Sequence, residues 1–201
     1  MPETAATADT RTPSGRLALA ASPDQIALGP LDGRYQSAVA PLVDYLSEAA
    51  LNRDRVGVEV EWLIHLTSNN VLPGAVQPTA EQQNKLRAIV TEFSSASVSE
   101  LAEIEVVTVH DVKAVEYYIG RRLPAIGIET LTAMVHFGCT SEDITNLASA
   151  LGVKAALAPW WLPAARPHVA QASPMAAAHR PRPPPAHPPG PPPPPPTSAT
   201  G

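Results

Sequence analysis

The sequence predicts an all-α protein. Apolar residues recur at helical spacing in several segments, and no run alternates apolar and polar residues with the period of two that a half-buried strand requires. Of the 24 prolines, 16 lie after residue 158. Because proline interrupts regular structure, the fold is expected mainly within residues ~25–158. The 201 residues are a length typical of one domain, or of two.

Composition excludes several classes of partner. The net charge of −5 and the pI near 5.6 argue against nucleic acid or an anionic membrane surface as the main partner. No segment approaches the ~18–20 apolar residues of a membrane span, and the N-terminus has no apolar core of a signal peptide. Cys139 is the only cysteine, so a disulfide framework is excluded and a reducing compartment is favoured. We therefore expect a cytoplasmic protein.

The first half of the chain is interpreted as a polar extension followed by helices. Residues 1–24 are rich in Ala, Thr, Ser and Pro, lack periodicity and are expected to be disordered. Residues 37–70 carry two apolar helical stripes, and the second includes Val56, Val60, Leu63 and Ile64. Trp62 and His65 lie on or near this apolar side and are interpreted as core or interface residues rather than ligands.

Local signals mark the helices that follow. Thr79-Ala80-Glu81-Gln82 is a capping-box sequence, which predicts a helix from there to about Phe93. Three further segments are expected to be helical: residues 98–105, a helix that begins at Asp111 and is closed by Leu123-Pro124, and residues 129–137.

The last predicted helix begins near Ser141. Its apolar stripe consists of Ile144, Leu147, Ala148, Leu151 and Val153, and is expected to be buried, or exposed where partner helices are lacking. Beyond it, an interior proline costs roughly 3 kcal/mol, so a continuous helix is not expected through Pro159, Pro163, Pro167 and Pro174. Residues 181–201 are expected to form polyproline II or to be disordered.

Two polar turns stand at predicted helix starts. The first presents His110, Asp111, Lys113 and Glu116 beside a helix whose apolar face points elsewhere. Taken alone, it fits a capped surface helix with a Lys113–Glu116 pair equally well. The second turn, residues 136–143, again brings His, Thr, Ser and acids to a helix start. Two such turns in one small chain indicate a shared site.

A third candidate is the loop over residues 28–35, which ends in Arg34 and Tyr35. Its Gly-Pro and Asp-Gly dipeptides predict tight turns. An arginine on such a turn is suited to binding a phosphate or a carboxylate through its planar fork of N–H groups. A surface ion pair is the simpler interpretation of the loop by itself.

Taken together, three segments resemble adenylosuccinate lyase, a family of the fumarase/aspartase superfamily. They are Pro30-Leu31-Asp32-Gly33-Arg34-Tyr35, His110-Asp111-Val112-Lys113-Ala114-Val115-Glu116-Tyr117 and His136-Phe137-Gly138-Cys139-Thr140-Ser141-Glu142-Asp143-Ile144. The resemblance covers residues ~26–158. It implies an N-terminal helical lyase domain over 25–130, the start of the central helical bundle over 131–180, and a proline-rich tail over 181–201. Argininosuccinate lyase and fumarase match these segments less well.

The resemblance also implies a reaction. The family eliminates fumarate from adenylosuccinate, leaving AMP, and from the succinyl-carboxamide nucleotide of purine biosynthesis, without a metal or organic cofactor. The full-length enzymes are homotetramers. By resemblance Arg34 and Tyr35 contact the substrate phosphate, and His110 and Asp111 surround the nucleotide and the succinyl part, with His110 in a supporting catalytic role. Thr140 and Ser141 grip a substrate carboxylate.

The chain departs from the family at two places. Val109 stands where the family usually has asparagine, which removes one polar contact to the substrate. In the tail, Pro189 occupies the place of the family's general-acid histidine, and His187 lies two residues too early. The sequence also ends before the loop that supplies the family's serine base. We therefore expect this polypeptide to be inactive by itself.

The proline-rich tail admits two interpretations. The spacing of the remaining residues in the tail follows the family segment that carries the general-acid histidine, while several other residues are replaced by proline. This favours an altered copy of that segment. The alternative is a non-catalytic interaction protein whose tail is a ligand for SH3- or WW-type domains.

Overall fold

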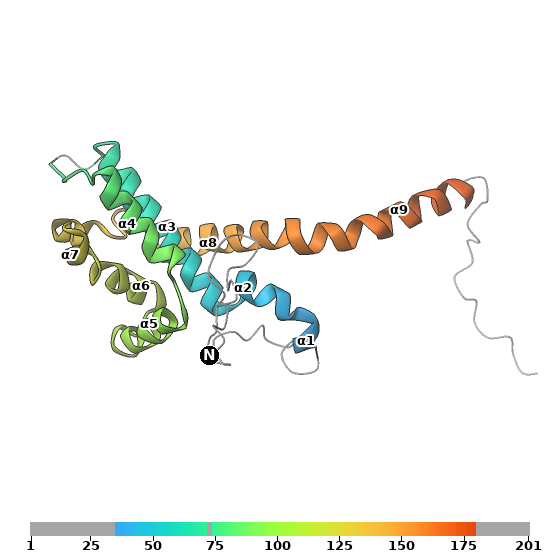
Figure 1. The fold of residues 1–201 in the computed structure, drawn as a ribbon, viewed down its shortest axis with the longest axis horizontal. Helices are drawn as coiled ribbons and strands as arrows, with labels where there is room; N and C mark the ends of the chain where they lie inside the picture. Colours follow the sequence, from blue (N-terminus) through green and yellow to red (C-terminus); the bar gives the residue numbers. More distant parts are fainter. Residues whose placement is uncertain (1–34, 72–73, 180–201) are drawn as a thin grey trace, which may run out of the picture. The chain divides into compact units, whose positions relative to one another are not determined.

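The computed structural model describes residues 35–71 and 74–179, and within these residues every regular element is helical (Figure 1). The all-α prediction is confirmed. Two compact units divide at residue 162. In chain order the first unit contains α1 (Gln36–Val39), η2 (Ala40–Leu42), α2 (Val43–Leu46), α3 (Glu48–Ser68), α4 (Ala80–Thr91), α5 (Ser95–Thr108), α6 (Asp111–Gly120), α7 (Leu123–Ile126), η3 (Glu129–Met134), α8 (Ser141–Ala156) and the π-turn η4 (Leu157–Trp161).

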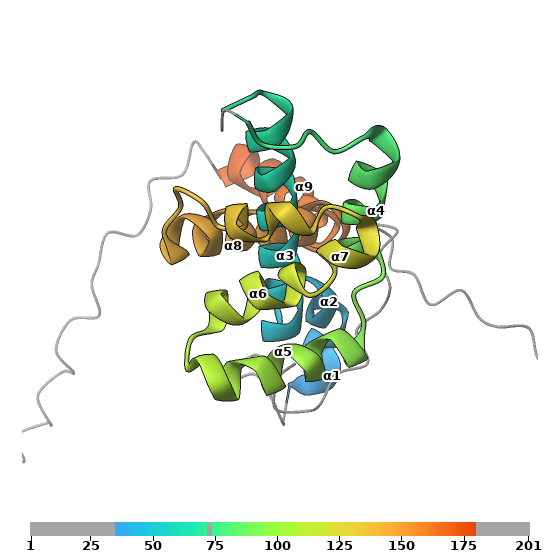
Figure 2. The same cartoon turned by 90° about the vertical axis from the view of Figure 1, so that its left-hand side faces the viewer.

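Helix α3 is the central element of this unit, because α2, α4, α6 and α8 all pack against it (Figure 2). Its N-cap is Ser47, whose hydroxyl accepts from the Ala50 N–H at 3.1 Å. The predicted stripe Val56, Val60, Leu63 and Ile64 is buried. It packs in one cluster with Phe93, Tyr118 and other apolar residues of α4 to η3. A second, smaller cluster of Val58, Val112, Ile144 and Ala148 joins α3 to α6 and α8.

The capping signals gave correct helix starts. Thr79 and Gln82 form the predicted capping box at the start of α4, and α8 begins at Ser141 as expected. Boundaries elsewhere differ. Helix α5 extends over 95–108 rather than 98–105, and residues 129–134 form a 3₁₀ helix. Helix α6 ends at Gly120, and Leu123-Pro124 instead opens α7, where the proline occupies a first-turn position that needs no N–H donor.

The apolar faces of α8 and α3 are only partly buried. On α8 the residues Leu147, Leu151 and Val153 are exposed, as expected for this stripe where partner helices are lacking, whereas Ile144 and Ala148 are buried. Periodicity identifies the apolar face of a helix, and the face of α8 is wider than the part that α3 and α6 cover. His65 is likewise exposed and Trp62 is half-buried, so neither belongs to the core.

The second unit contributes α9 (Leu162–His179) to the described residues, and no residue of α9 is buried. The expectation that prolines prevent a helix here is wrong, since Pro167 and Pro174 both lie inside α9. Each removes one N–H donor, and the residues four positions earlier, Pro163 and Ala170, are exposed to water that can satisfy their carbonyls. Pro159 falls in the π-turn, where the wider backbone accommodates its ring. No helix in the described residues has the length and apolar character needed to cross a bilayer.

Helices α2 and α8 approach closely at Gly152. A Cβ atom at this position would lie 2.7 Å from the Tyr45 backbone oxygen, a distance shorter than any ordinary contact. Gly152 is therefore required by packing, although a glycine in mid-helix is unfavourable in itself by roughly 1 kcal/mol relative to alanine.

We predict that Gly152→Ala lowers the free energy of unfolding by about 1–3 kcal/mol, because the backbone of α2 must move to admit the methyl group. Urea unfolding followed by circular dichroism measures this change. Gly57→Ala is the matched control, since its Cβ would meet only a Val90 methyl at 3.6 Å, and it should be neutral or stabilising. A Gly152→Ala variant as stable as the control would contradict this account of the contact.

Candidate functional site

The two polar turns meet, as the sequence predicted. His110 is the N-cap of α6, and its Nδ1 accepts from the Lys113 backbone N–H at 3.1 Å. In the neutral ring this bond places the proton on Nε2. Nε2 lies 3.4 Å from the hydroxyl oxygen of Ser141, the first residue of α8. The N-terminal ends of two helices, each with the partial positive charge of a helix start, thus lie side by side.

Thr140 is the N-cap of α8 and is engaged within its own turn. Its hydroxyl accepts from the Asp143 N–H at 3.3 Å and donates to Asp143 Oδ2 at 2.9 Å, while its backbone N–H donates to the same oxygen at 2.8 Å. Hydrogen bonds from the Thr140 backbone and hydroxyl lower the pKa of Asp143. Of the predicted pair, only Ser141 turns its hydroxyl toward His110.

Asp111 is held by a buried arginine that sequence reasoning missed. Asp111 Oδ2 lies 2.8 Å from Arg55 Nη2, and Oδ1 accepts from the Val112 N–H at 2.8 Å. The same guanidinium donates to Thr145 on α8 at 3.2 Å and to Asn52 at 3.0 Å. Arg55 on α3 therefore connects α6 and α8, the two helices whose starts form the site.

The pKa of Asp111 is the balance of opposing effects. Burial raises it, but the Val112 N–H and the Arg55 guanidinium together lower it below its ordinary value. Its ionised form is thus favoured in the folded protein. Because the folded-state pKa is depressed, the stability that Asp111 contributes is present above the unfolded pKa of 3.8 and is lost as the pH falls through the folded-state pKa.

We predict that Arg55→Met destabilises the protein by about 2 kcal/mol at neutral pH, since it removes the partner of a half-buried carboxylate. NMR titration should show the pKa of Asp111 rising, and the difference in stability from wild type should narrow below about pH 4. Arg87→Met is the matched control: the Arg87–Glu61 pair is bidentate but exposed, so its loss should cost less than 1 kcal/mol. Equal effects of the two substitutions would contradict the connecting role of Arg55.

A second feature that the sequence did not predict is the buried pair of Glu59 and His136, at the start of the turn over residues 136–143. Glu59 of α3 is fully buried and contacts His136 twice: Oε2 accepts from its backbone N–H at 3.1 Å, and Oε1 lies 2.5 Å from ring Nδ1. Burial raises the pKa of Glu59, and the His136 contacts oppose that rise only in part. A glutamate between the buried Val58 and Val60 is the signal that could have found this pair, because a buried carboxyl requires a partner.

We predict that Glu59→Gln becomes more stable relative to wild type as the pH rises from about 4 to 7. A buried acid with a raised pKa costs wild type increasing stability above the unfolded pKa of 4.5, and glutamine has no such cost while its oxygen still accepts from the His136 N–H. Urea unfolding of both proteins at several pH values measures the trend. A stability difference that is constant or falls with pH would contradict it.

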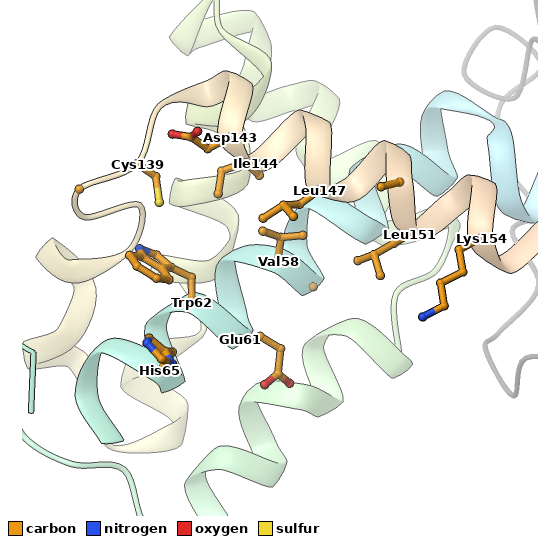
Figure 3. A pocket seen from close by; sticks show the side chains of 13 residues that line it. Val58, Glu61, Trp62, His65, Cys139, Asp143, Ile144, Leu147, Leu151 and Lys154 are labelled. Atoms are coloured by element: carbon orange, nitrogen blue, oxygen red, sulfur yellow. The ribbon is translucent and has the colours of Figure 1, made fainter. Parts of the chain in front are cut away.

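A groove of about 730 Å³ lies between α3 and α8 (Figure 3). Val58, Trp62, Leu147 and Leu151 line it, with Asp143 at one end of the α8 side and Lys154 at the other. Trp62 stacks on His65 with ring centroids 5.6 Å apart, and its Nε1–H donates to the Phe137 carbonyl at 2.9 Å. No group of three His, Cys, Asp or Glu side chains in the described residues is close enough to hold a metal ion.

Comparison with known proteins gives one consistent result. The chain is 45% identical over 127 residues to the adenylosuccinate lyase of Haemophilus influenzae, 38% over 133 residues to that of Legionella pneumophila and 39% over 140 residues to that of Escherichia coli K12. The alignments cover 62%, 66% and 67% of this chain and 28%, 29% and 31% of those relatives. This chain is related to the adenylosuccinate lyases. It spans less than a third of the length of these relatives, and no family model matches it.

The structure does not test the phosphate contacts that the sequence resemblance assigns to Arg34 and Tyr35. Arg34 lies outside the described residues, as do the proline-rich tail and Pro189. Tyr35 is the first described residue, and it is half exposed just before α1. The assignment of these two residues therefore stays a prediction from the resemblance.

Val109, which stands at the family's usual asparagine position, adopts a left-handed backbone conformation with φ of 51°. It ends α5, directly precedes His110, and leaves 87% of its surface exposed. A β-branched residue is strained in this region of φ/ψ space, whereas asparagine enters it readily. The valine at this position therefore strains the backbone directly beside His110.

We predict that Val109→Asn raises the free energy of unfolding by about 1 kcal/mol, because asparagine relieves the left-handed strain. Thermal and urea unfolding measure it. Val106→Asn serves as the control: Val106 is equally exposed but lies within α5, where asparagine should be neutral or slightly unfavourable. A Val109→Asn variant no more stable than Val106→Asn would contradict the strain.

Proposed function

We propose that this chain is the substrate-binding N-terminal part of an adenylosuccinate lyase. The observation that carries the proposal is the approach of Ser141 to His110 at the starts of two helices, on a chain related to that family. Elimination of fumarate creates negative charge beside carboxylates that are already charged. Helix N-termini stabilise such anions through their free N–H groups.

The roles proposed for individual residues follow from their positions. Ser141 binds a carboxylate of the succinyl group with the N–H groups of the first turn of α8, and Thr140 shapes that turn. His110 donates from Nε2 to the substrate. Asp111, which is ionised and held by Arg55, helps to position the substrate. Arg34 and Tyr35 bind the phosphate.

The proposed reaction breaks the bond between the succinyl carbon and the nitrogen that carries it, which is the amino nitrogen of the purine in adenylosuccinate and the carboxamide nitrogen in the second substrate. A base removes the proton beside the other carboxylate, the electron pair forms the double bond of fumarate, and an acid protonates the departing nitrogen. The substrates are adenylosuccinate and the succinyl-carboxamide nucleotide of purine biosynthesis. Because Pro189 stands at the place of the general acid, we propose that these 201 residues bind the nucleotide without turning it over. We also propose the cytoplasm as the compartment and the homotetramer of the family as the full-length assembly.

Thermal-shift titration with AMP and with fumarate tests the binding function. A ligand that binds only the folded state raises the melting temperature with its concentration relative to Kd. We expect a saturable shift that is lost in His110→Ala and in Ser141→Ala and retained in Ser149→Ala, an exposed serine on the same helix. No shift with either ligand on a chain that melts cooperatively would contradict the proposal. Turnover of adenylosuccinate above a matched blank would contradict the expected inactivity.

A further inference from the structure

The turn that leads into α8 is bonded to α3 at its first two residues. The carboxylate of Glu59 accepts from the His136 backbone N–H at 3.1 Å and lies 2.5 Å from the ring Nδ1. Trp62 donates from Nε1 to the Phe137 carbonyl at 2.9 Å, and Figure 3 shows its indole lying close to the loop that carries Cys139. The partners in these bonds are 77 and 75 residues apart in the sequence, so the bonds hold the start of α8 against α3.

Arg55, Glu59 and Trp62 form a row along α3. Their spacing of four and then three residues places the three side chains on one face of the helix. Arg55 donates to the hydroxyl of Thr145 at 3.2 Å, and Thr145 follows Ser141 in α8, whereas Glu59 and Trp62 bind residues that precede Ser141. Glu59 is fully buried and Arg55 is 7% exposed. The chain is therefore held by one face of α3 on both sides of Ser141.

The backbone of this turn adopts a conformation that needs support from outside. His136 has a φ of 65° and Gly138 a φ of 73°. Glycine enters this left-handed region freely, but other residues are strained there. Because one carboxylate binds both the backbone N–H and the ring of His136, it fixes the backbone and the side chain of that residue together. The conformation of the turn, and with it the position of Ser141, therefore depends on Glu59.

We propose that Glu59 and Trp62 are positioning residues for carboxylate binding: they hold Ser141 and the first turn of α8 where a carboxylate of the substrate binds. Both act through the turn, and neither side chain has to touch the ligand. A buried acid between Val58 and Val60 is unfavourable for stability in itself, and its contribution is the fixed turn. The inference rests on the proposed function for the identity of the ligand, and on the bonds of the row for the positioning.

NOE spectroscopy on the full chain tests the positioning without a ligand. Wild type should show an NOE between the ring of His110 and the methylene of Ser141, since Nε2 and Oγ lie 3.4 Å apart. We expect Glu59→Leu to lose this NOE, because leucine removes both bonds to His136 without leaving a buried charge. Glu59→Gln should keep it, because the amide oxygen still accepts from the His136 N–H. Glu61→Leu, the same change at an exposed residue of α3 outside the row, is the matched control and should keep the NOE. An NOE that is absent from wild type, or that survives in Glu59→Leu, would overturn the inference.

Titration of the same proteins with fumarate, followed by NMR, tests the link to binding. We expect Kd to rise about tenfold in Glu59→Leu and about threefold in Trp62→Phe, which keeps an aromatic ring but loses the N–H donor, because a misplaced turn binds the carboxylate less well. Glu59→Gln and Glu61→Leu should leave Kd unchanged. Rescue by glutamine separates positioning from a general loss of packing, and circular dichroism verifies that each variant is folded.

Two results of the titration would refute the positioning role: a Kd that neither Glu59→Leu nor Trp62→Phe changes, or a Kd that Glu61→Leu raises as much as Glu59→Leu does. A folded wild type that does not bind fumarate would instead contradict the proposed function, and the NOE between His110 and Ser141 would then decide the positioning by itself.

Discussion

The structure depends on one buried guanidinium. Arg55 is buried on α3 and is bonded to α6 through Asp111 and to α8 through Thr145. A buried arginine is costly unless its charge is paired, so the bonds of Arg55 to Asp111 and Thr145 favour one register of the three helices. Because that register brings the starts of α6 and α8 together, the geometry of the candidate site follows from the packing of α3.

The site is built from backbone as much as from side chains. The side chains of His110 and Thr140 accept capping hydrogen bonds from the first turns of α6 and α8. These bonds fix the directions in which the first-turn N–H groups point. Two positive helix ends in one place suit a substrate that carries several negative charges. Val109 shows the cost of this arrangement, since the turn between α5 and α6 requires a left-handed residue immediately before His110.

Local features of the fold were predictable from sequence, whereas long-range partners were not. Thr79 and Ser141 were placed correctly because capping depends on residues within one turn. Whether Leu147 is buried or exposed could not be decided from sequence, because periodicity reports which face of a helix is apolar and says nothing of what covers that face. Pro167 was expected to end a helix that tolerates it in an exposed position. Arg55 and Glu59 have partners 56 and 77 residues away in the sequence. The local sequence shows only that each is a charged residue on an apolar helix face, and it does not identify the partner.

The most direct measurement of the central claim is an NMR experiment on His110 and Ser141 at about pH 8. Long-range ¹H–¹⁵N correlation identifies which imidazole nitrogen is protonated, and NOE spectra report whether the ring lies near the Ser141 methylene. The account predicts a proton on Nε2, a bare Nδ1 that accepts from the Lys113 N–H, and an NOE between the ring and Ser141 that weakens in Arg55→Met. A ring protonated on Nδ1 with no NOE to Ser141 would contradict it, because the two helix starts would then not form one site.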